Sequence, residues 1–240
     1  MVTVMHDSPV GQESASPQWL AIDVGNSRVK FGLFAGPGES SLPECLASLT
    51  AALNGLIPWD ELVHACEGFD FRSAIVGSNQ KGVDRVLSEW PARLGRPPRA
   101  FRDSSRFPIL IDVEYPSRVG LDRLLTAVAA NVIRPVDRDV IVVDCGTATT
   151  IDRVDSRGVF SGGAILPGFE LSALSLHHYT EVLPLIPIAA IIDVDSNSGG
   201  HDALGRNTLD AMMSGIFWGQ IGAVRELISR LSSAGSDSSI

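Results

Sequence analysis

The sequence predicts an α/β protein made of two related halves, and three observations support this prediction. Residues 20–34 read as an apolar strand, an Asp-x-Gly turn and a returning strand, and residues 140–152 repeat that design about half a chain later. In the first copy, apolar residues alternate with others along both strands, which is typical of half-buried strands. Between and after the copies, apolar residues recur at helical spacing. Two such turns suggest two halves that face each other across a nucleotide.

Length, charge and cysteine content restrict the class of protein. The 240 residues, 45% of them hydrophobic, are enough to form one large domain or two of ordinary size. A formal net charge of −9 argues against a nucleic-acid partner, which needs clustered Lys and Arg, but not against a small anionic ligand. Three cysteines without a Cys-x-x-Cys pair indicate reduced thiols in a cytoplasmic protein. We expect no transmembrane segment, no secretory signal and no membrane partner.

The first copy carries the groups that a phosphate needs. The connector Gly25-Asn26-Ser27 contains residues that readily adopt turn conformations, and it supplies backbone N–H groups and short polar side chains. Lys30 adds a positive charge in the returning strand, and Asp23 can hold a metal ion directly or through water. An isolated Gly-Asn-Ser would be read as an ordinary hairpin with an Asx turn. The second copy favours the functional interpretation.

The rest of the first half alternates predicted helices and short strands. Helices are expected at residues 58–67 and 81–94, with a buried strand at 73–77 between them. Residues 99–102 read as an edge strand, and residues 107–117, which hold two prolines, as the crossover between halves. Residues 40–70 are weakly patterned, and within them only the possible helix at 58–67 is assigned.

A helix is predicted to begin at Ser117 or Gly120 and to end at Pro135. Asp122 lies in its first turn, where the helix dipole favours an ionised carboxylate. An acidic residue at this position is also common in helices without any functional role. Both interpretations of Asp122 stay open on the helix pattern alone.

The second half continues with a third strand and two helices. Residues 158–168 form the strand, in which Gly162-Gly163 marks either a bulge or a place where a ligand meets bare backbone. A helix is expected at 169–179, then a proline-broken loop through Ile192 and a flexible polar segment at 193–201.

The last predicted element is a long helix capped by Asn207-Thr208. Gly215 and Gly219 lie four residues apart inside it, and each costs about 1 kcal/mol of helix stability relative to alanine. Something must therefore approach that face closely, either a partner helix or another part of this chain. The residues predicted to form the buried stripe are Leu209, Met213, Ile216, Phe217, Val224, Leu227 and Leu231.

Four motifs follow one another along the chain: Asp23-x-Gly25-Asn26-Ser27-x-x-Lys30, Gly120-x-Asp122-Arg123, Asp144-x-Gly146-Thr147-Ala148-x-Thr150-x-Asp152 and Gly162-Gly163-x-x-x-Pro167-Gly168. In this order they resemble the motifs of the type III pantothenate kinases, a family of the actin-like, sugar-kinase and Hsp70 ATPase superfamily. The resemblance extends from about Leu20 to Leu231 and implies two ribonuclease H-like halves with mixed central sheets flanked by helices. The implied organisation is a disordered extension at 1–17, halves at 18–116 and 117–232, and a flexible tail at 233–240.

The resemblance also implies roles for individual residues. Asp122 would be the general base, and Asp144 would bind a monovalent cation, K⁺ or NH₄⁺. Asp23 would hold Mg²⁺ through water. The family forms homodimers with the substrate site near the subunit interface, so Thr180 would serve the neighbouring chain. The implied ATP contacts are Asp23, Val24, Gly25, Asn26, Ser27, Arg28, Val29, Lys30 and Thr147, and the implied pantothenate contacts are Gly120, Leu121, Asp122, Arg123 and Thr180.

The expected function is therefore ATP-dependent phosphorylation of pantothenate to 4′-phosphopantothenate, the first step of coenzyme A biosynthesis. Two departures from the family pattern are Val113, where the family often has tyrosine, and Ser27, where threonine is common. Two alternatives stay open: another small-molecule kinase or phosphatase of the same superfamily, and a non-catalytic regulator on the same fold.

Overall fold

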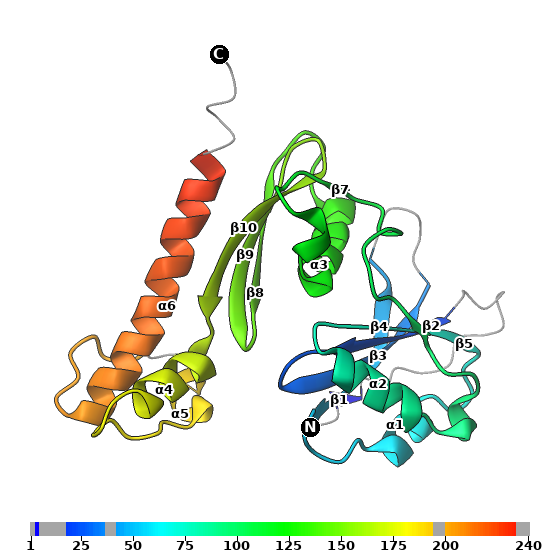
Figure 1. Cartoon of the computed structure of the whole chain (residues 1–240), viewed down its shortest axis with the longest axis horizontal. Coiled ribbons are helices and arrows are strands. Elements are labelled where there is room, and N and C mark those ends of the chain that lie inside the picture. Colours follow the sequence, from blue (N-terminus) through cyan, green and yellow to red (C-terminus); the bar gives the residue numbers. More distant parts are fainter. Residues whose placement is uncertain (1–2, 5–17, 37–41, 194–199, 234–240) are drawn as a thin grey trace. The chain divides into compact units, whose positions relative to one another are not determined.

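The computed structural model describes residues 3–4, 18–36, 42–193 and 200–233 (Figure 1). The described chain divides into two compact units, one formed by residues up to 109 together with 114–133, the other by 110–113 and 134 onward. The helix after Gly120 groups with the first unit by this division, whereas the sequence placed it in a second half that begins at residue 117. The α/β class is confirmed, because each unit is a β-sheet flanked by helices.

The first unit is a six-stranded sheet in the order β1-β4-β3-β2-β5-β6. Its hairpin pairs β2 with β3, and β2 also pairs with β5 in parallel. The strands are β1 (Thr3–Val4), β2 (Gln18–Val24), β3 (Arg28–Ala35), β4 (Glu44–Ala52), β5 (Phe71–Gly77) and β6 (Arg99–Ala100). Strand β1 falls inside the predicted disordered extension, and the other residues of that extension lie outside the described part.

The alternation along β2 separates the two faces of this sheet. Leu20, Ile22 and Val24 are at most 1% exposed and belong to the main hydrophobic core. That core also contains residues of α1 (Trp59–Ala65) and α2 (Gln80–Ser88), so these two helices cover the same face. The other face carries Ala21 and Asp23.

Two elements of the first unit differ from the sequence prediction. Strand β4 lies in the segment that received no element, although Leu49 and Ala51 are buried and alternate with Ser48 and Thr50. The helix predicted at 81–94 ends at Ser88, and a separate 3₁₀ turn forms at Ala92–Leu94 after Pro91. Proline lacks the N–H that would continue the helix, which explains the break. A second 3₁₀ turn, Pro116–Arg118, precedes α3 (Leu121–Ile133).

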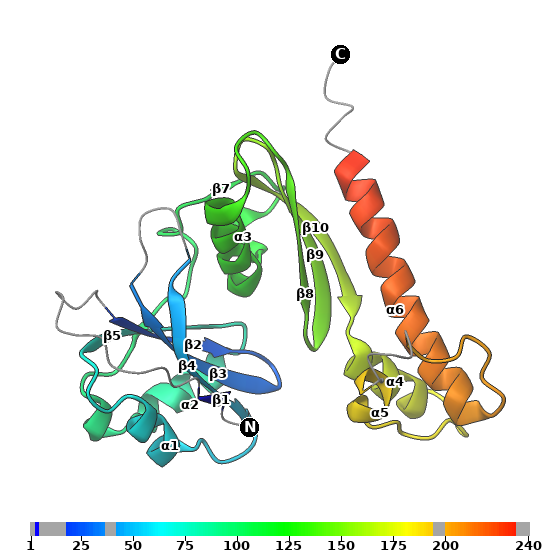
Figure 2. The same ribbon diagram turned by 180° about the vertical axis from the view of Figure 1, so that it is seen from behind.

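The second unit has a four-stranded sheet in the order β7-β10-β9-β8. Strand β7 (Leu110–Ile111) pairs in parallel with β10 (Val159–Pro167), which pairs antiparallel with β9 (Ala148–Val154), and β9 with β8 (Val140–Cys145). The predicted crossover at 107–117 thus contributes an edge strand. Figure 2 shows the long helix α6 (Thr208–Ser233) beside the strands of this sheet.

Three details of the second unit correct or refine the sequence prediction. The register of β10 shifts between Phe160 and Gly163, and Gly162 has φ +87°, so the glycine pair is a bulge. Helix α4 (Phe169–His178) is followed by α5 (Ile188–Ile192) inside the predicted loop. The buried residues of α6 include Met212 and Ile216, whereas Leu209, expected to be buried, is 44% exposed.

Within the described residues, no helix has both the length and the apolar character needed to cross a membrane.

Candidate functional site

The first acidic turn is held on both sides by backbone hydrogen bonds. The Gly25 N–H donates to the Arg28 carbonyl over 2.9 Å, and the Leu53 N–H donates to the Ser27 carbonyl, also over 2.9 Å. The side chains of Asn26 and Ser27 are exposed at the tip. The turn therefore presents short polar groups on a backbone that is fixed by β3 and by the end of β4.

Asp23 and Lys30 lie opposite each other in the β2–β3 ladder, on the face away from α1 and α2. Lys30 Nζ is 3.6 Å from Asp23 Oδ2, and the two side chains are 61% and 42% exposed. Exposed ion pairs contribute little to stability. A ligand at the end of β2 can therefore reach both side chains. Thr50 of β4 pairs with Lys30, which adds a hydroxyl to the same part of the sheet.

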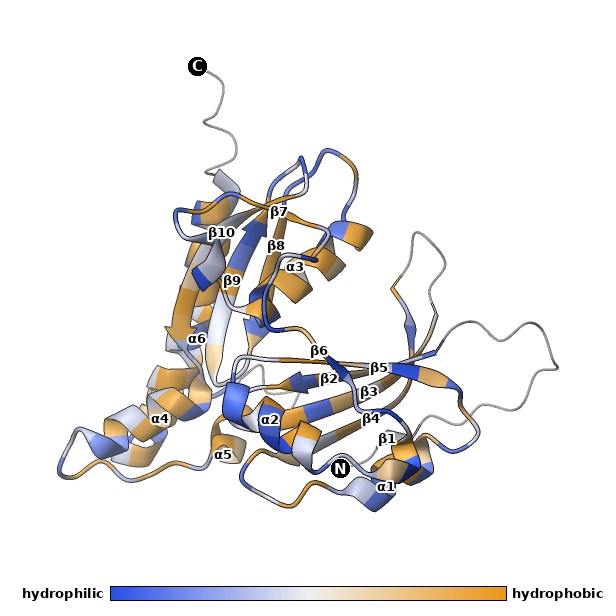
Figure 3. Cartoon of the chain, turned by 45° about the vertical axis from the view of Figure 1, so that its right-hand side comes forward, coloured by the Kyte–Doolittle hydropathy of each residue, from blue (hydrophilic) through white to orange (hydrophobic). Residues whose placement is uncertain are grey.

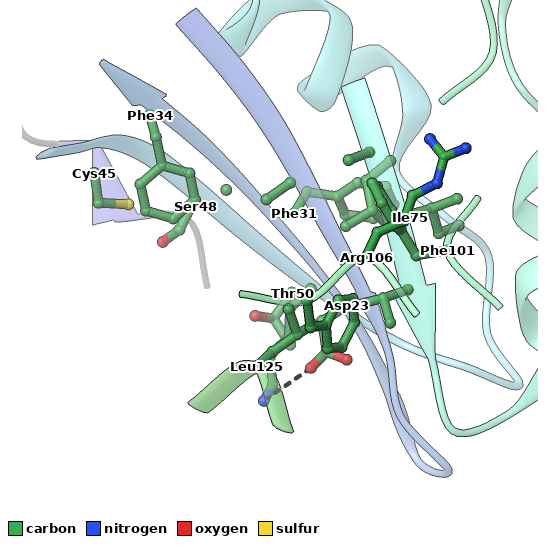
Figure 4. Close-up of a pocket in the computed structure, with 17 residues that line it drawn as sticks. Asp23, Phe31, Phe34, Cys45, Ser48, Thr50, Ile75, Phe101, Arg106 and Leu125 are labelled. Atoms are coloured by element: carbon green, nitrogen blue, oxygen red, sulfur yellow. Dashed lines mark ion pairs between the residues drawn. The ribbon is translucent and has the colours of Figure 1, made fainter. Parts of the chain in front are cut away.

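A cavity of about 710 Å³ lies on this face of the first sheet. In Figure 4, Asp23 and Thr50 lie near Leu125 at one end, and Phe34, Cys45 and Ser48 lie at the other. A Cβ at Gly32 would come within 2.5 Å of the Phe34 ring, so the ring lies over bare backbone. The cavity is largely apolar, with the charges of Asp23, Lys30 and Arg106 on its lining.

The start of α3 fixes the position of the Asp122 carboxylate. Asp122 Oδ1 accepts a hydrogen bond from the Arg123 N–H at 2.8 Å. A Cβ at Gly120 would meet the same oxygen, so a side chain there would require the Asp122 carboxylate to move. Leu125, one helical turn after Asp122, lines the cavity. The predicted acceptor motif therefore opens a helix that borders the cavity, and its carboxylate still has a second oxygen, Oδ2, for a ligand.

The second acidic turn is closed by its own strand and by the start of α4. The Gly146 N–H donates to the Ala148 carbonyl, and the Gly168 N–H donates to the Thr147 carbonyl, each over 3.0 Å. A Cβ at Gly168 would collide with the carbonyl oxygens of Gly146 and Thr147. The helix α4 thus begins directly beside the turn, and no side chain caps its N-terminus. Free N–H groups at a helix N-terminus favour anions.

Asp144 and Thr147 are both exposed at this turn. Asp144 pairs with Thr150 in the β8–β9 ladder, as Asp23 pairs with Lys30 in the first hairpin. The described residues hold no group of three or more His, Cys, Asp or Glu side chains placed to bind a metal ion. Carboxylates at the ends of β2 and β8, next to hydroxyl side chains, are nevertheless the hard oxygen donors that Mg²⁺ and K⁺ accept.

Buried aspartates near the glycine bulge have a structural role. Asp152 is fully buried, and a Cβ at Gly163 would collide with the Ile151 carbonyl oxygen and with Asp152, so the bulge glycine allows the close approach of β9. Asp155 Oδ1 accepts hydrogen bonds from the Val159 and Arg157 N–H groups, each at 2.9 Å. Burial by itself raises the pKa of Asp155, but these hydrogen bonds and the Arg157 guanidinium outweigh it and lower the pKa below its usual range.

Thr180 closes the C-terminal end of α4. Its hydroxyl donates to the Leu176 carbonyl at 2.7 Å and accepts from the Leu183 N–H at 3.4 Å. The residue is exposed, as are its neighbours Tyr179 and Val182 at 82% and 84%. Thr180 therefore lies on an exposed surface of the second unit that also carries His178 and Glu181.

Sequence reasoning missed the residues that line the far part of the cavity. Ser48 and Thr50 come from β4, and Arg106 and Phe107 from the segment after β6. The period-two pattern of Ser48, Leu49, Thr50 and Ala51 was the available signal for the β4 residues. No local signal marks Arg106 or Phe107, because the fold alone brings them to this face.

Comparison of the sequence with models of protein families identifies the family of this chain. The family model described as type III pantothenate kinase matches residues 19–230. The chain belongs to the type III pantothenate kinase family. Curated relatives named type III pantothenate kinase include those of Rhodospirillum centenum, 32% identical over 229 residues, and Ruegeria sp., 31% identical over 222 residues. Each match covers 88% of this chain and 79% of the relative.

The solved structures that match this chain are less similar to it in sequence than the curated relatives are. The ethanolamine utilization protein EutJ from Carboxydothermus hydrogenoformans matches 96% of this chain and 75% of its own, at 14% identity and a TM-score of 0.45. The activator of 2-hydroxyisocaproyl-CoA dehydratase from Clostridium difficile matches 89% and 76%, at 13% identity and a TM-score of 0.44.

Proposed function

We propose that this chain transfers the γ-phosphoryl group of ATP to the 4′-hydroxyl of pantothenate, the first step of coenzyme A biosynthesis. Membership of the type III pantothenate kinase family carries the proposal. The geometry adds support, because the predicted ATP and acceptor motifs both lie at turns or helix starts with accessible polar groups. We also propose that the chain acts in the cytoplasm, which is consistent with a step of coenzyme A biosynthesis.

In this proposal, residues 23–30 and Thr147 contact the phosphates of ATP. Support comes from the exposed Asn26 and Ser27, the Lys30 ammonium, and the uncapped start of α4 beside Thr147. Phosphoryl transfer depends mainly on positioning and on neutralising phosphate charge. Backbone N–H groups and Lys30 supply that neutralisation from this chain.

Asp122 is the proposed general base. Its Oδ1 is engaged by the Arg123 N–H, so Oδ2 would accept the hydrogen bond of the 4′-hydroxyl and orient that hydroxyl toward the phosphorus. In a loose transition state the proton moves late, and the carboxylate acts mostly by orientation. Arg123 would bind the pantothenate carboxylate in a bidentate pair, or alternatively a phosphate. Gly120 and Leu121 complete the proposed acceptor contacts.

Two cations are part of the proposal. Asp23 would hold Mg²⁺ through water, and Asp144 would hold K⁺ or NH₄⁺. Both are carboxylates near strand ends that solvent reaches, and carboxylate oxygens are ligands that these hard cations accept. When bound, these ions offset negative charge on the phosphates.

A homodimer with Thr180 near the neighbouring chain's pantothenate is also proposed. The exposed Tyr179 and Val182 on either side of Thr180 support an interface, since large exposed apolar groups often mark protein contacts.

A coupled ADP-release assay with alternative acceptors tests the proposed reaction. Pantothenate, acetate and a hexose are offered with Mg-ATP, with and without K⁺. The expected result is ADP release with pantothenate alone, increased by K⁺. Turnover with only acetate or hexose would assign a different kinase, and no turnover together with binding to a protein or DNA partner would favour the regulator.

A further inference from the structure

A run of regularly spaced arginines in the first unit has no part in the proposed reaction. Residues 93–106 contain five arginines and a single acidic residue, Asp103, although the whole chain carries a formal net charge of −9. None of the five belongs to the proposed ATP or pantothenate contacts. The local excess of positive charge therefore needs another explanation. The first four arginines are spaced three residues apart, at Arg93, Arg96, Arg99 and Arg102.

Three of these arginines, together with Arg72, line a pocket of about 650 Å³. The pocket is formed by residues of the segments 63–73 and 93–99, and we call it the arginine pocket. Its lining comes from the end of α1 and the turn after it, the start of β5, the first 3₁₀ turn and the start of β6. In Figure 3, β6 lies beside β5 and begins in the blue of hydrophilic residues.

The arginine pocket lies far from the acidic turn of the same sheet. Strands β2 and β5 run parallel, with Gln18 opposite Phe71 and Val24 opposite Gly77. Phe71 lines the pocket at the start of β5, whereas the acidic turn follows Val24 at the end of β2. Because a strand rises about 3.3 Å per residue, about 20 Å separate the two. A small ligand in the pocket therefore leaves the acidic turn free.

Two of the four arginines are positioned by aromatic rings. The guanidinium carbon of Arg72 lies 5.8 Å from the centre of the Trp19 ring, and that of Arg99 lies 5.3 Å from the centre of the Phe101 ring. Such a contact holds a guanidinium in place without a carboxylate that would neutralise its charge. Both arginines therefore keep their full charge for an anion.

The other charged side chains of the pocket do not cancel this positive charge. Arg96 forms no ion pair with a described residue, and Arg93 pairs with Asp60 where both side chains are exposed. Glu67 and Asp70 also line the pocket, but neither forms an ion pair with a lining arginine in the described part of the chain. Four guanidinium groups thus stand against two carboxylates, and like charges gathered in one pocket repel each other unless an anion lies between them.

Apolar side chains form another part of the lining. Phe69 is 38% exposed and offers the surface of its ring to a ligand, next to the partly buried Val63. Cys66 is almost fully buried, and burial raises the pKa of its thiol to about 11. The thiol is therefore neutral at pH 7 and does not repel an anion. A few charged donors beside an apolar surface are typical of a small-molecule site.

We propose that the arginine pocket binds a small phosphomonoester, with the phosphate held by the guanidinium groups and an apolar body against Phe69 and Val63. A phosphomonoester carries about 1.5 to 2 negative charges at pH 7, which matches the excess of positive charge on the lining. The planar fork of a guanidinium also pairs with two phosphate oxygens at once. A carboxylate would bring a single charge and leave part of the excess unmatched.

Calorimetric titration of the full chain with phenyl phosphate tests this site. The wild type is expected to bind it saturably, and Arg96→Gln on the order of tenfold more weakly, because a charge-assisted hydrogen bond is lost. Arg96 forms no ion pair with a described residue, so this variant should keep its circular dichroism spectrum and its thermal midpoint. Arg225→Gln, which removes an exposed arginine of α6 outside the pocket, is the matched control and should bind like the wild type.

Inorganic phosphate and benzoate test the two parts of the ligand separately. Both should bind more weakly than phenyl phosphate, since inorganic phosphate lacks the apolar body and benzoate carries one charge. Equal affinity for inorganic phosphate would overturn the role of the apolar lining, and equal or tighter binding of benzoate would overturn the assignment of a phosphomonoester. The site itself is wrong if phenyl phosphate does not bind, or if Arg96→Gln binds it with wild-type affinity.

Discussion

The two acidic hairpins share a backbone design but are held in place by different neighbours. In the first, β2 is flanked by β3 and β5, and Leu20, Ile22 and Val24 are almost fully buried. In the second, β8 pairs with β9 alone among the described strands, and its last residues, including Asp144, are exposed. The second turn instead depends on Gly168 at the start of α4. The same local sequence pattern can thus be stabilised by burial in a hydrophobic core or by hydrogen bonding to the start of a neighbouring helix.

Replacing the proposed base should have the largest effect. Asp122→Asn keeps the side-chain shape but removes the proton acceptor, so kcat should fall about 10²- to 10⁴-fold while ATP binding is retained. Steady-state kinetics and ATP titration measure the two effects. Asp60→Asn, in the first turn of α1, is the matched control and should leave kcat unchanged. Near-normal turnover in Asp122→Asn would remove this residue from the base role and leave it an ordinary first-turn residue.

In the proposal the two acidic turns bind different cations, Mg²⁺ at Asp23 and K⁺ or NH₄⁺ at Asp144. Asp144→Ala should turn over poorly even at high K⁺, because the cation loses its carboxylate ligand. An activity titration with KCl against NaCl, at constant ionic strength, measures the response. If the variant responds to K⁺ as the wild type does, the cation binds elsewhere and the chemical distinction between the turns disappears.

Replacing one glycine with alanine in or beside each turn compares how tightly the two turns are packed. Gly168→Ala should destabilise the protein by about 1–3 kcal/mol, because the methyl group collides with the second turn. Gly25→Ala should cost less than about 0.5 kcal/mol, since its Cβ would lie 3.4 Å from the Arg28 oxygen. Urea denaturation measures both. Equal losses would show that the turns do not differ in this respect.

Acid should weaken the second unit through Asp155. Asp155→Asn should cost about 1–3 kcal/mol at pH 7, because buried hydrogen bonds to a carboxylate are lost. The folded pKa is lowered below the unfolded value near 3.9, so this stability is present above about pH 4 and lost as pH falls through the folded pKa. Urea denaturation at pH 7 and pH 3 should show a smaller difference between variant and wild type at the lower pH. Asp139→Asn is the control, because the Asp139 side chain pairs with Arg153 and is 28% exposed against 10% for Asp155.

The sequence predicted the parts of the molecule that depend on local pattern. Alternation of Leu20, Ile22 and Val24 predicted β2, and the glycine pair at 162–163 predicted the bulge. Strand β4 was missed because its first residues, Cys45 to Ala47, lack clear alternation. The cavity on the first sheet could not be predicted from the sequence, because only the tertiary structure brings together Phe34, Ser48, Arg106 and Leu125. The proposed catalytic and binding roles of individual residues stay predictions.

Titration of ATP against Asp23→Ala and Asp144→Ala tests most directly the claim that both acidic turns serve the nucleotide. The account predicts that each single variant, measured by calorimetry in Mg²⁺ and K⁺, binds ATP at least about tenfold more weakly than the wild type. Wild-type affinity in either variant would contradict the claim.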